Sequence, residues 1–339
     1  MKKLFAAVLG GAAALAMSVS MTFAADKEVT IGYQLIYNPW KVAIADGEFE
    51  KATGYKIRWE KFDSGAKVIT AMASGDVDIA LAGSSPIAAA VSRNLPIELF
   101  WITENINDAE ALVVRNGSGI EKMADLKGKK VAVPFVSTTH FHMLFALEHH
   151  KIDPKEVNLL NMQPNAIAAA WERGDIDATF VWDPALGRVK KTGKVLLTSG
   201  DLAKLGKATF DGMMVGKEFA SKNADFMCKF VSIIADADKA YRDKPDAFGP
   251  DSDNAKKIVK LVGGEPADVK GVLDLYDFPS LEQQASATWL GGGKDSGAAK
   301  ALLATSEFLL EQKKIEKLLP DYGAVVNDKF AQAALKGCK

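Results

Sequence analysis

The stretch Ala73-Ser74-Gly75-Asp76-Val77-Asp78-Ile79-Ala80 recurs in altered form later in the chain, as Glu172-Arg173-Gly174-Asp175-Ile176-Asp177-Ala178-Thr179. Each copy has the pattern of a helix end, a Gly suited to the left-handed position after the helix, and the start of a strand. Repetition of such a unit indicates two similar lobes within one chain. Chance reuse of a common helix-to-strand turn is the alternative, because Gly is widely used at that position.

Short β-rich runs alternate with helical patterns on both sides of these stretches. We expect strands at 28–33, 55–62, 77–82, 97–102, 111–115, 130–134, 157–160, 178–181 and 194–197. The helical patterns between them include 39–52, 66–73, 139–150 and 165–172. This alternation favours βαβ units, in which parallel strands are covered by helices on both faces.

After Val215 the pattern becomes mainly helical, with expected helices at 217–243, 253–262, 281–290 and 297–313. We expect this tail to pack on the first lobe. The predicted organisation is a leader at 1–24, a first lobe from 25–110 and 212–339, and a second lobe from 111–211. The loop 291–294 is no nucleotide-binding loop, because the Gly–x4–Gly–Lys–Ser/Thr spacing is absent.

The first residues have the features of a secretory signal. Lys2 and Lys3 form a positive start, and 4–17 is an apolar run too short to span a bilayer comfortably. Thr22 and Ala24 are small residues at the −3 and −1 positions of a cleavage site. We expect cleavage after Ala24 and release into the periplasm. A membrane anchor is the alternative.

The charge of the chain is nearly balanced. The formal net charge is −1 over 339 residues and becomes −3 without the two leader lysines, so neither nucleic acid nor a membrane surface is indicated as a partner. A hydrophobic content of 48% is enough for two domains, which we expect to form a monomer. Cys228 and Cys338 can pair in an oxidising compartment, and two free thiols are the alternative.

Pairs of hydroxyl residues stand where two of the expected strands give way to helices. Ser84 and Ser85 form one pair, and Thr138 and Thr139 form the other. Backbone N–H groups at a helix start lack intrahelical partners and carry partial positive charge. Two such helix starts at one cleft can bind an oxyanion without Arg or Lys. An ordinary helix cap, which needs one hydroxyl, is the alternative for each pair.

Two carboxylates and one aromatic residue stand near the expected crossovers between the lobes. Asp211 and Glu110 would complement a ligand ammonium, because a carboxylate that faces a closed cleft is costly unless it is paired. Taken alone, Asp211 is better explained as a solvated hinge carboxylate. Trp182, at a strand end, fits either the wall of a cleft or the core.

The sequence contains no recognisable catalytic or metal-binding pattern. His140 and His142 are separated by one residue, and neither they nor the adjacent pair His149-His150 match the i, i+4 spacing of a zinc helix. A Gly-x-Ser-x-Gly elbow and a paired cysteine motif are also absent. We therefore expect no catalytic residues, metal or cofactor. The histidines are expected at the surface or in packing, and only His140 is expected near the cleft.

Several motifs resemble those of the sulfonate- and nitrate-binding proteins of bacterial ABC importers. The similarity covers nearly all of the mature chain and is densest at 62–66, 83–86, 110–114, 133–140 and 170–177. The Ser-Thr-Thr-His run at 137–140 is typical of the taurine-binding branch. The resemblance implies a type II periplasmic binding protein with two α/β lobes, two crossover strands, and the ligand between the lobes.

The resemblance also implies roles for individual residues. Ser84, Ser85, Thr138 and Thr139 would receive a sulfonate, and Asp211 would hold an ammonium, with Glu110 as a weaker candidate. Gln34, His140 and Trp182 complete the expected site.

The implied function is delivery of taurine to a membrane permease that a separate ATPase drives, without a cofactor. Other alkanesulfonates or nitrate-like anions are the alternative ligands. Enzymes of thiamine-pyrimidine synthesis use the same architecture, but they need a cytoplasmic setting and a reactive His or Cys in the cleft.

Overall fold

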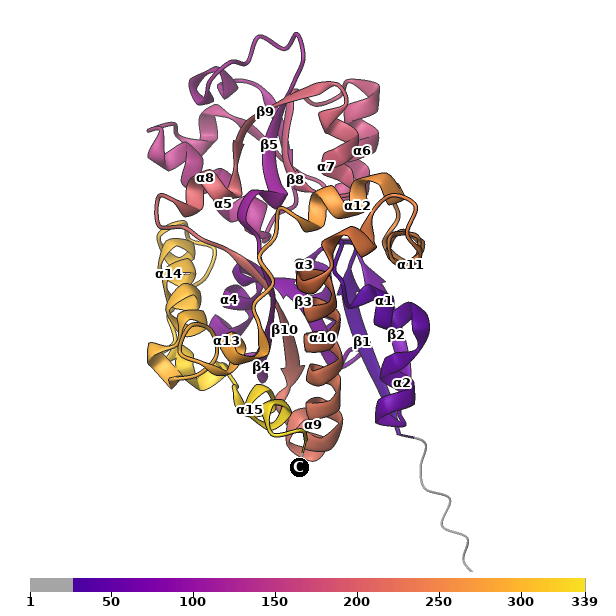
Figure 1. The fold of residues 1–339 in the computed structure, drawn as a ribbon. Coiled ribbons are helices and arrows are strands. Elements are labelled where there is room, and N and C mark those ends of the chain that lie inside the picture. Colours follow the sequence, from indigo (N-terminus) through magenta and orange to yellow (C-terminus); the bar gives the residue numbers. More distant parts are fainter. Residues whose placement is uncertain (1–26, 339) are drawn as a thin grey trace, which may run out of the picture.

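The computed structural model describes residues 27–338, which fold into two α/β lobes, each built around a five-stranded sheet (Figure 1). The first sheet has the order β2-β1-β3-β10-β4, from β1 (Glu28–Gln34), β2 (Lys56–Phe62), β3 (Ile79–Gly83), β4 (Ile97–Asn105) and β10 (Phe210–Gly216). The second has the order β7-β6-β8-β5-β9, from β5 (Glu110–Arg115), β6 (Lys130–Val133), β7 (Asn158–Asn161), β8 (Ala178–Trp182) and β9 (Gly193–Thr198). The predicted two-lobed α/β fold is confirmed.

The expectation of parallel strands fails at one strand in each lobe. β10 runs antiparallel to both β3 and β4, and β5 runs antiparallel to both β8 and β9. The remaining neighbours pair in parallel. Both exceptions enter their sheet directly from the other lobe, so no helical crossover within the sheet fixes their direction.

The two repeated stretches form matching units, as predicted. Gly75 ends α3 (Gly65–Ser74) at a φ of 82°, and Gly174 ends α6 (Pro164–Arg173) at a φ of 81°. Glycine adopts this left-handed conformation without steric cost. The chain then enters β3 in one lobe and β8 in the other, which are the central strands of the two sheets.

Two of the expected helices are broken. The helix expected at 39–52 divides at Gly47, which has a φ of 66°, into α1 (Lys41–Asp46) and α2 (Glu48–Thr53). The helix expected at 217–243 divides at Asn223 into α9 (Lys217–Lys222) and α10 (Ala224–Asp243). Backbone geometry at single residues interrupts a side-chain pattern that continues across the break.

The other helices cover the sheets and form the tail. They are α4 (Ser84–Ser92), α5 (Thr138–His149), α7 (Ala185–Lys190), α8 (Ser199–Ala203), α11 (Asp253–Val262), α12 (Pro266–Leu273), α13 (Leu281–Ala285), α14 (Gly297–Glu311) and α15 (Lys329–Leu335). Short 3-10 helices are η1 (Asn107–Ala109), η2 (Met123–Leu126), η3 (Pro154–Glu156), η4 (Pro245–Phe248), η5 (Gly293–Asp295) and η6 (Tyr322–Val325). The tail packs on the first lobe, where α14 contacts α4 and α10 contacts α2.

The chain crosses between the lobes twice, after β4 and before β10. Glu110 is the first residue of β5 in the second sheet, whereas Asp211 already belongs to β10 in the first. The lobe boundaries derived from the sequence stay predictions, and the expected leader at 1–24 lies outside the described residues. Within 27–338, no helix combines the length and apolar character needed to cross a membrane.

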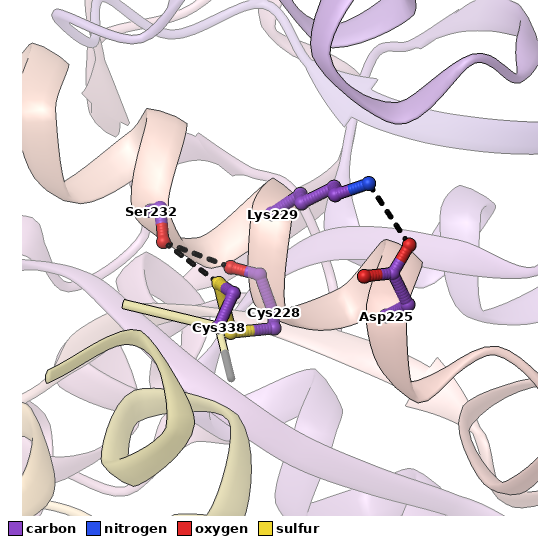
Figure 2. The surroundings of a disulfide bond; sticks show 5 residues. All are labelled: Asp225, Cys228, Lys229, Ser232 and Cys338. Carbon is purple, nitrogen blue, oxygen red and sulfur yellow. Dashed lines mark hydrogen bonds and ion pairs between the residues drawn. A yellow bond between two sulfur atoms is a disulfide. The ribbon is translucent and has the colours of Figure 1, made fainter. Parts of the chain in front are cut away.

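A disulfide joins Cys228 on α10 to Cys338 near the end of the chain, as Figure 2 shows. The Cα atoms are 5.7 Å apart, so the expected pairing is confirmed. The bond spans a sequence separation of 110 residues. In the chain-entropy model, closing a loop of that length stabilises the fold by about 4 to 5 kcal/mol, because it restricts the unfolded chain.

Candidate ligand-binding cleft

A narrow cleft between the lobes collects residues from both sheets and from the tail. Its empty space, with the open solvent at its mouth included, is about 340 Å³. The lining residues are Gln34, Ile36, Gly65, Gly83, Pro86, Ile106, Glu110, Ser137, Thr138, Trp182, Asp211 and Tyr276. Gln34, Gly83 and Trp182 stand at the carboxyl ends of strands, where open α/β sheets bind ligands.

The starts of α4 and α5 face each other across this cleft. A Cβ atom built on Gly83 would lie 2.7 Å from Cγ2 of Thr138 and 3.2 Å from Oδ1 of Asp211. Gly83 is the N-cap of α4 and provides no side-chain cap, so the first amides of that helix keep their donor capacity. The two junctions therefore approach each other closely, with a carboxylate beside them.

A third helix start, which the sequence analysis missed, borders the same cleft. Gly65 begins α3, and its N-cap Ser64 is buried with a hydroxyl that has no hydrogen-bond partner. A Cβ atom on Gly65 would lie 2.8 Å from Cγ of Pro86, so the starts of α3 and α4 are packed together. The available signal was a Ser directly after a strand and before a helical pattern, which is typical of an N-cap.

The four predicted hydroxyls do not stand in equivalent positions. Thr138 lines the cleft, and its hydroxyl is hydrogen-bonded to Glu110. The Thr139 hydroxyl lies 2.8 Å from Oγ of Ser137, and Oγ of Ser84 accepts the N–H of Phe210 at 3.5 Å. Ser84, Ser85 and Thr139 are buried and are not among the lining residues. Backbone amides at the helix starts are therefore prominent donors in the cleft.

Asp211 is a buried carboxyl and not a solvated hinge residue, so the simpler interpretation of it is wrong. It is 7% exposed, and in the sheet its backbone stands opposite Gly83 of β3 on one side and Glu104 of β4 on the other. Burial raises the pKa of Asp211 to about 6, although the neighbouring Glu104 carboxyl and the charge of Lys41 oppose this rise. Burial and the charge of Asp211 also hold the pKa of Glu104 well above its usual range.

A buried ammonium lies behind these two carboxyls. Nζ of Lys41 donates to Oδ1 of Asn38 at 3.0 Å, and Nδ2 of Asn38 donates to Oε2 of Glu104 at 2.9 Å. The ammonium also lies 3.7 Å from the ring centroid of Trp40. Burial lowers the pKa of Lys41 to about 7. The sequence analysis missed Lys41, because a lysine within a helical pattern is normally solvated.

Glu110 is the second carboxyl of the cleft and is 4% exposed. One of its oxygens is hydrogen-bonded to Thr138, and the other lies 2.9 Å from Oγ of Ser199. Burial raises the pKa of Glu110 to about 8; its bonds to the two hydroxyls oppose this rise, and the charge of Asp211 adds to it. Within 27–338, no group of three or more His, Cys, Asp or Glu residues could hold a metal ion.

Two of the histidines are placed differently from the prediction, whereas His149 and His150 are exposed as expected. His140 does not line the cleft: its ring stacks on Phe135 at 4.4 Å, and its Nδ1 accepts the N–H of Val136 at 3.2 Å. His142 instead approaches Glu110, with Nδ1 3.9 Å from Oε2. Two residues correspond to about 200° around a helix, so the two rings point to opposite sides of α5.

The remaining lining residues come from three parts of the chain. Trp182 is 5% exposed and lines the cleft while it packs in the core, so both interpretations of it apply. Nε2 of Gln34 donates to the carbonyl of Leu81 at 3.5 Å. Tyr276 comes from the tail, and burial together with the neighbouring carboxylates raises its pKa well above the usual range. The sequence analysis gave the tail only a packing role and missed Tyr276.

Comparison with known proteins identifies the family. Residues 27–305 match the substrate binding domain of the ABC-type glycine betaine transport system. The chain belongs to this family of substrate-binding domains. It is a solute-binding receptor with two lobes around one cleft.

The receptor is similar to curated proteins over nearly its whole length. It is 41% identical over 304 residues to the taurine-binding periplasmic protein of Escherichia coli K12, which covers 90% of this chain and 92% of that protein. It is 27% identical over 318 residues to a putative aliphatic sulfonates-binding protein of Bacillus subtilis, covering 91% and 89% of the two chains.

Solved structures confirm the fold of the receptor. The periplasmic aliphatic sulphonate binding protein of Escherichia coli superposes with a TM-score of 0.70 at 21% identity, over 90% of this chain and 99% of that one. The desulfurization enzyme DSZB superposes with a TM-score of 0.65 at 17% identity, over 92% and 100% of the chains. Receptors and an enzyme share this architecture, so its use must be argued from the cleft.

Proposed function

We propose that this receptor binds taurine in the periplasm and delivers it to a membrane permease that a separate ATPase drives. The observation that carries the proposal is the meeting of the α4 and α5 starts beside two buried carboxyls, Asp211 and Glu110. Taurine joins a sulfonate to an ammonium through two carbons. The similarity to a taurine-binding periplasmic protein supports the same ligand.

The sulfonate binds at the helix starts. A sulfonate stays anionic at physiological pH, so neutral donors are sufficient and no titrating base is needed. Helices α3, α4 and α5 have 10, 9 and 12 residues, long enough for a full dipole at each N-terminus. Gly65 and Gly83 leave the backbone of two of these starts open to the ligand.

The ammonium binds between the carboxyls. Asp211 is its main partner and Glu110 its second, because both line the cleft and both are almost inaccessible to water. A buried carboxylate without a counter-charge is unfavourable, and the ligand ammonium supplies that charge. Trp182 and Gln34 complete the wall around the two-carbon link.

Ligand binding closes the two lobes. One lobe binds the ligand first, and the other then completes the set of donors, while the segments next to Glu110 and Asp211 absorb the change in backbone angles. Asn165 of the second lobe donates to Oδ1 of Asp63 in the first at 3.2 Å, a bond that opening would break. The closed receptor, a monomer without cofactor, presents its surface to the permease after removal of residues 1–24.

Calorimetry and thermal shift with a panel of ligands test the proposal. We expect taurine to bind more tightly than ethanesulfonate, nitrate or glycine betaine, since only taurine combines a sulfonate with a primary ammonium at this spacing. A larger alkanesulfonate needs more room around Trp182 than the narrow cleft offers. Absence of heat and of a thermal shift with taurine on the order of millimolar concentration would refute the proposal.

A further inference from the structure

A row of hydrogen bonds runs from Glu110 into the protein interior. Oε2 of Glu110 lies 2.9 Å from Oγ of Ser199, and that oxygen lies 2.7 Å from Nδ1 of His142. Nε2 of His142 lies 2.7 Å from the carbonyl oxygen of Lys207. The His142 side chain is 0% exposed. The proposed function uses Glu110 but assigns nothing to Ser199 or His142.

The acceptor at the far end of the row fixes the number of protons. A carbonyl oxygen only accepts, so Nε2 of His142 carries a hydrogen. When the imidazole is neutral, Nδ1 accepts the single hydrogen of Ser199, and Ser199 must then accept a hydrogen from a protonated Glu110. When Glu110 is ionised, Ser199 donates to it, and Nδ1 must donate to Ser199 as part of an imidazolium.

With no proton or with two protons shared between Glu110 and His142, one hydrogen bond of the row would be lost. An ionised Glu110 with a neutral His142 gives two acceptors to one hydroxyl hydrogen, so lone pairs face each other at 2.7 Å or 2.9 Å. A protonated Glu110 with an imidazolium directs two hydrogens at the same oxygen in addition to its own. An unsatisfied buried polar group is costly, so the row holds one mobile proton.

We propose that Ser199 and His142 are positioning residues that share one proton with Glu110, and that this proton moves to His142 when a ligand ammonium lies against Glu110. The Oε2–H bond of Glu110 breaks as its proton passes to Oγ of Ser199, and the former Ser199 proton forms the Nδ1–H bond. The number of protons and the net charge of the row stay constant. This inference rests on the proposed function.

Without a ligand, the proton belongs to Glu110. Burial raises the pKa of Glu110 to about 8 and lowers the pKa of His142 to about 4, so both directions favour the neutral pair. The other titratable groups that face Glu110 are Asp211 and Tyr276, and a charged Asp211 further disfavours an ionised Glu110. An ammonium at Glu110 reverses this balance by favouring the carboxylate.

The side chains packed around the His142 ring are aromatic, so the charge of His142 depends on its hydrogen bonds to Ser199 and through it to Glu110. Its ring packs against Phe180 at 6.1 Å and Phe141 at 5.4 Å. Lys207 contributes only its carbonyl, because its ammonium lies over the rings of Phe145 and Phe308. The charge of the Glu110 carboxyl thus follows the charge of the ligand, and the empty cleft avoids a second buried anion.

Nitrogen NMR of His142 near neutral pH is the direct test. Without ligand and with ethanesulfonate, we expect a neutral imidazole with its hydrogen on Nε2; with taurine, we expect hydrogens on both nitrogens. If taurine binds and His142 stays neutral, the shared proton is refuted while the proposed function stands. If taurine fails to bind, the proposed function is refuted, and a ligand-free His142 with its hydrogen on Nδ1 alone would refute the shared proton as well.

Calorimetry in buffers of different ionisation enthalpy gives a second test with Ser199→Ala. Without the hydroxyl, taurine must expel the Glu110 proton to solvent, so the variant should release about one more proton than the wild type. Ionising a group with a pKa of about 8 at neutral pH lowers the affinity by about tenfold. Ethanesulfonate should bind both proteins equally.

Ser92→Ala is the matched control, because Ser92 is also buried and bonded to another hydroxyl, that of Tyr322 at 3.1 Å, away from the cleft. It should behave as the wild type with both ligands. Equal losses for taurine and ethanesulfonate in Ser199→Ala, or an unchanged proton count, would overturn the role of the row.

Discussion

Asp211 and Glu110 occupy corresponding places on the two crossovers, but they are supported by different chemistry. Behind Asp211 stand a second carboxyl, Glu104, and the ammonium of Lys41, linked through Asn38. Behind Glu110 stand hydroxyls and an imidazole, and among residues 27–338 no fixed counter-charge is in contact with it. The first carboxyl is partly balanced by the charge of a neighbouring lysine, whereas the second is balanced by a proton.

The difference shows how a receptor can keep two carboxyls in one dry cleft. Two permanent anions would repel each other and would require a ligand cation for stability. A carboxyl with a cationic neighbour and a carboxyl that stays protonated until the ligand arrives avoid that cost. The predictions below test this contrast.

The largest expected effect comes from Asp211→Asn. The amide keeps the shape of the side chain but cannot balance an ammonium, so taurine should lose about 2 to 5 kcal/mol of binding free energy. Ethanesulfonate lacks the amine and should lose much less. Calorimetry with both ligands measures the difference, and an equal loss for the two would remove Asp211 from its assigned role.

Lys41→Met should remove a pH dependence of stability that the wild type shows above neutral pH. Burial lowers the pKa of Lys41 to about 7, below its ordinary value of 10.5, so the charged side chain destabilises the folded wild type at neutral pH. The wild type should therefore gain stability relative to Lys41→Met as pH rises from 7 to 10.5, by at most about 1.4 kcal/mol per pH unit. Urea denaturation of both proteins across pH measures the difference, and parallel curves would show that the buried ammonium has no net cost.

The control for Lys41→Met is Lys257→Met, which removes an ammonium that pairs with Asp46 at 2.7 Å in a partly exposed position. Its effect should stay below about 1 kcal/mol, because solvent screens the pair. A pH dependence as large as that expected for Lys41→Met would mean that burial of the ammonium is not the cause.

Glu110→Gln should change how stability depends on pH. The folded pKa of about 8 lies above the ordinary value of 4.5, so the proton stabilises the wild type fully below pH 4.5, and this contribution is lost as pH rises through 8. The wild type should thus lose stability relative to Glu110→Gln over this range, by at most about 1.4 kcal/mol per pH unit. Thermal denaturation of both proteins measures it; parallel curves would place the Glu110 proton in doubt.

The smallest effect is expected from His140→Phe. Its ring stacks on Phe135 and points away from the row behind Glu110, so taurine affinity should change by less than about twofold. Calorimetry with taurine checks this. A change comparable to that of Ser199→Ala would show that α5 acts on the cleft through more than His142.

The fold was predictable because its signals are local. Gly75 and Gly174 mark two helix ends, and strand periodicity marks the sheets around them. The helix starts at Gly83 and Thr138 were likewise visible as hydroxyl pairs after strands. Broken helices and antiparallel entries were missed, since they depend on one backbone angle at Gly47 or on the path between the lobes.

The residues that contact the cleft carboxyls from the protein interior were not predictable, because these contacts join positions far apart in the sequence. Asn38 meets Glu104 across 66 residues of sequence, and His142 meets Ser199 across 57. Nothing near His142 in the sequence distinguishes it from His140. Only the rotation of α5 against α8 and β5 decides which ring stands behind Glu110.

The missing side chain at Gly83 has a consequence for the moving parts. Its φ of −68° is open to every residue, so no backbone strain reserves this position for glycine. Glycine is needed here because of space, since even a methyl group would lie 2.7 Å from Cγ2 of Thr138. With alanine at this position, the receptor would fold and one lobe would still bind the ligand, but the two lobes could not close completely.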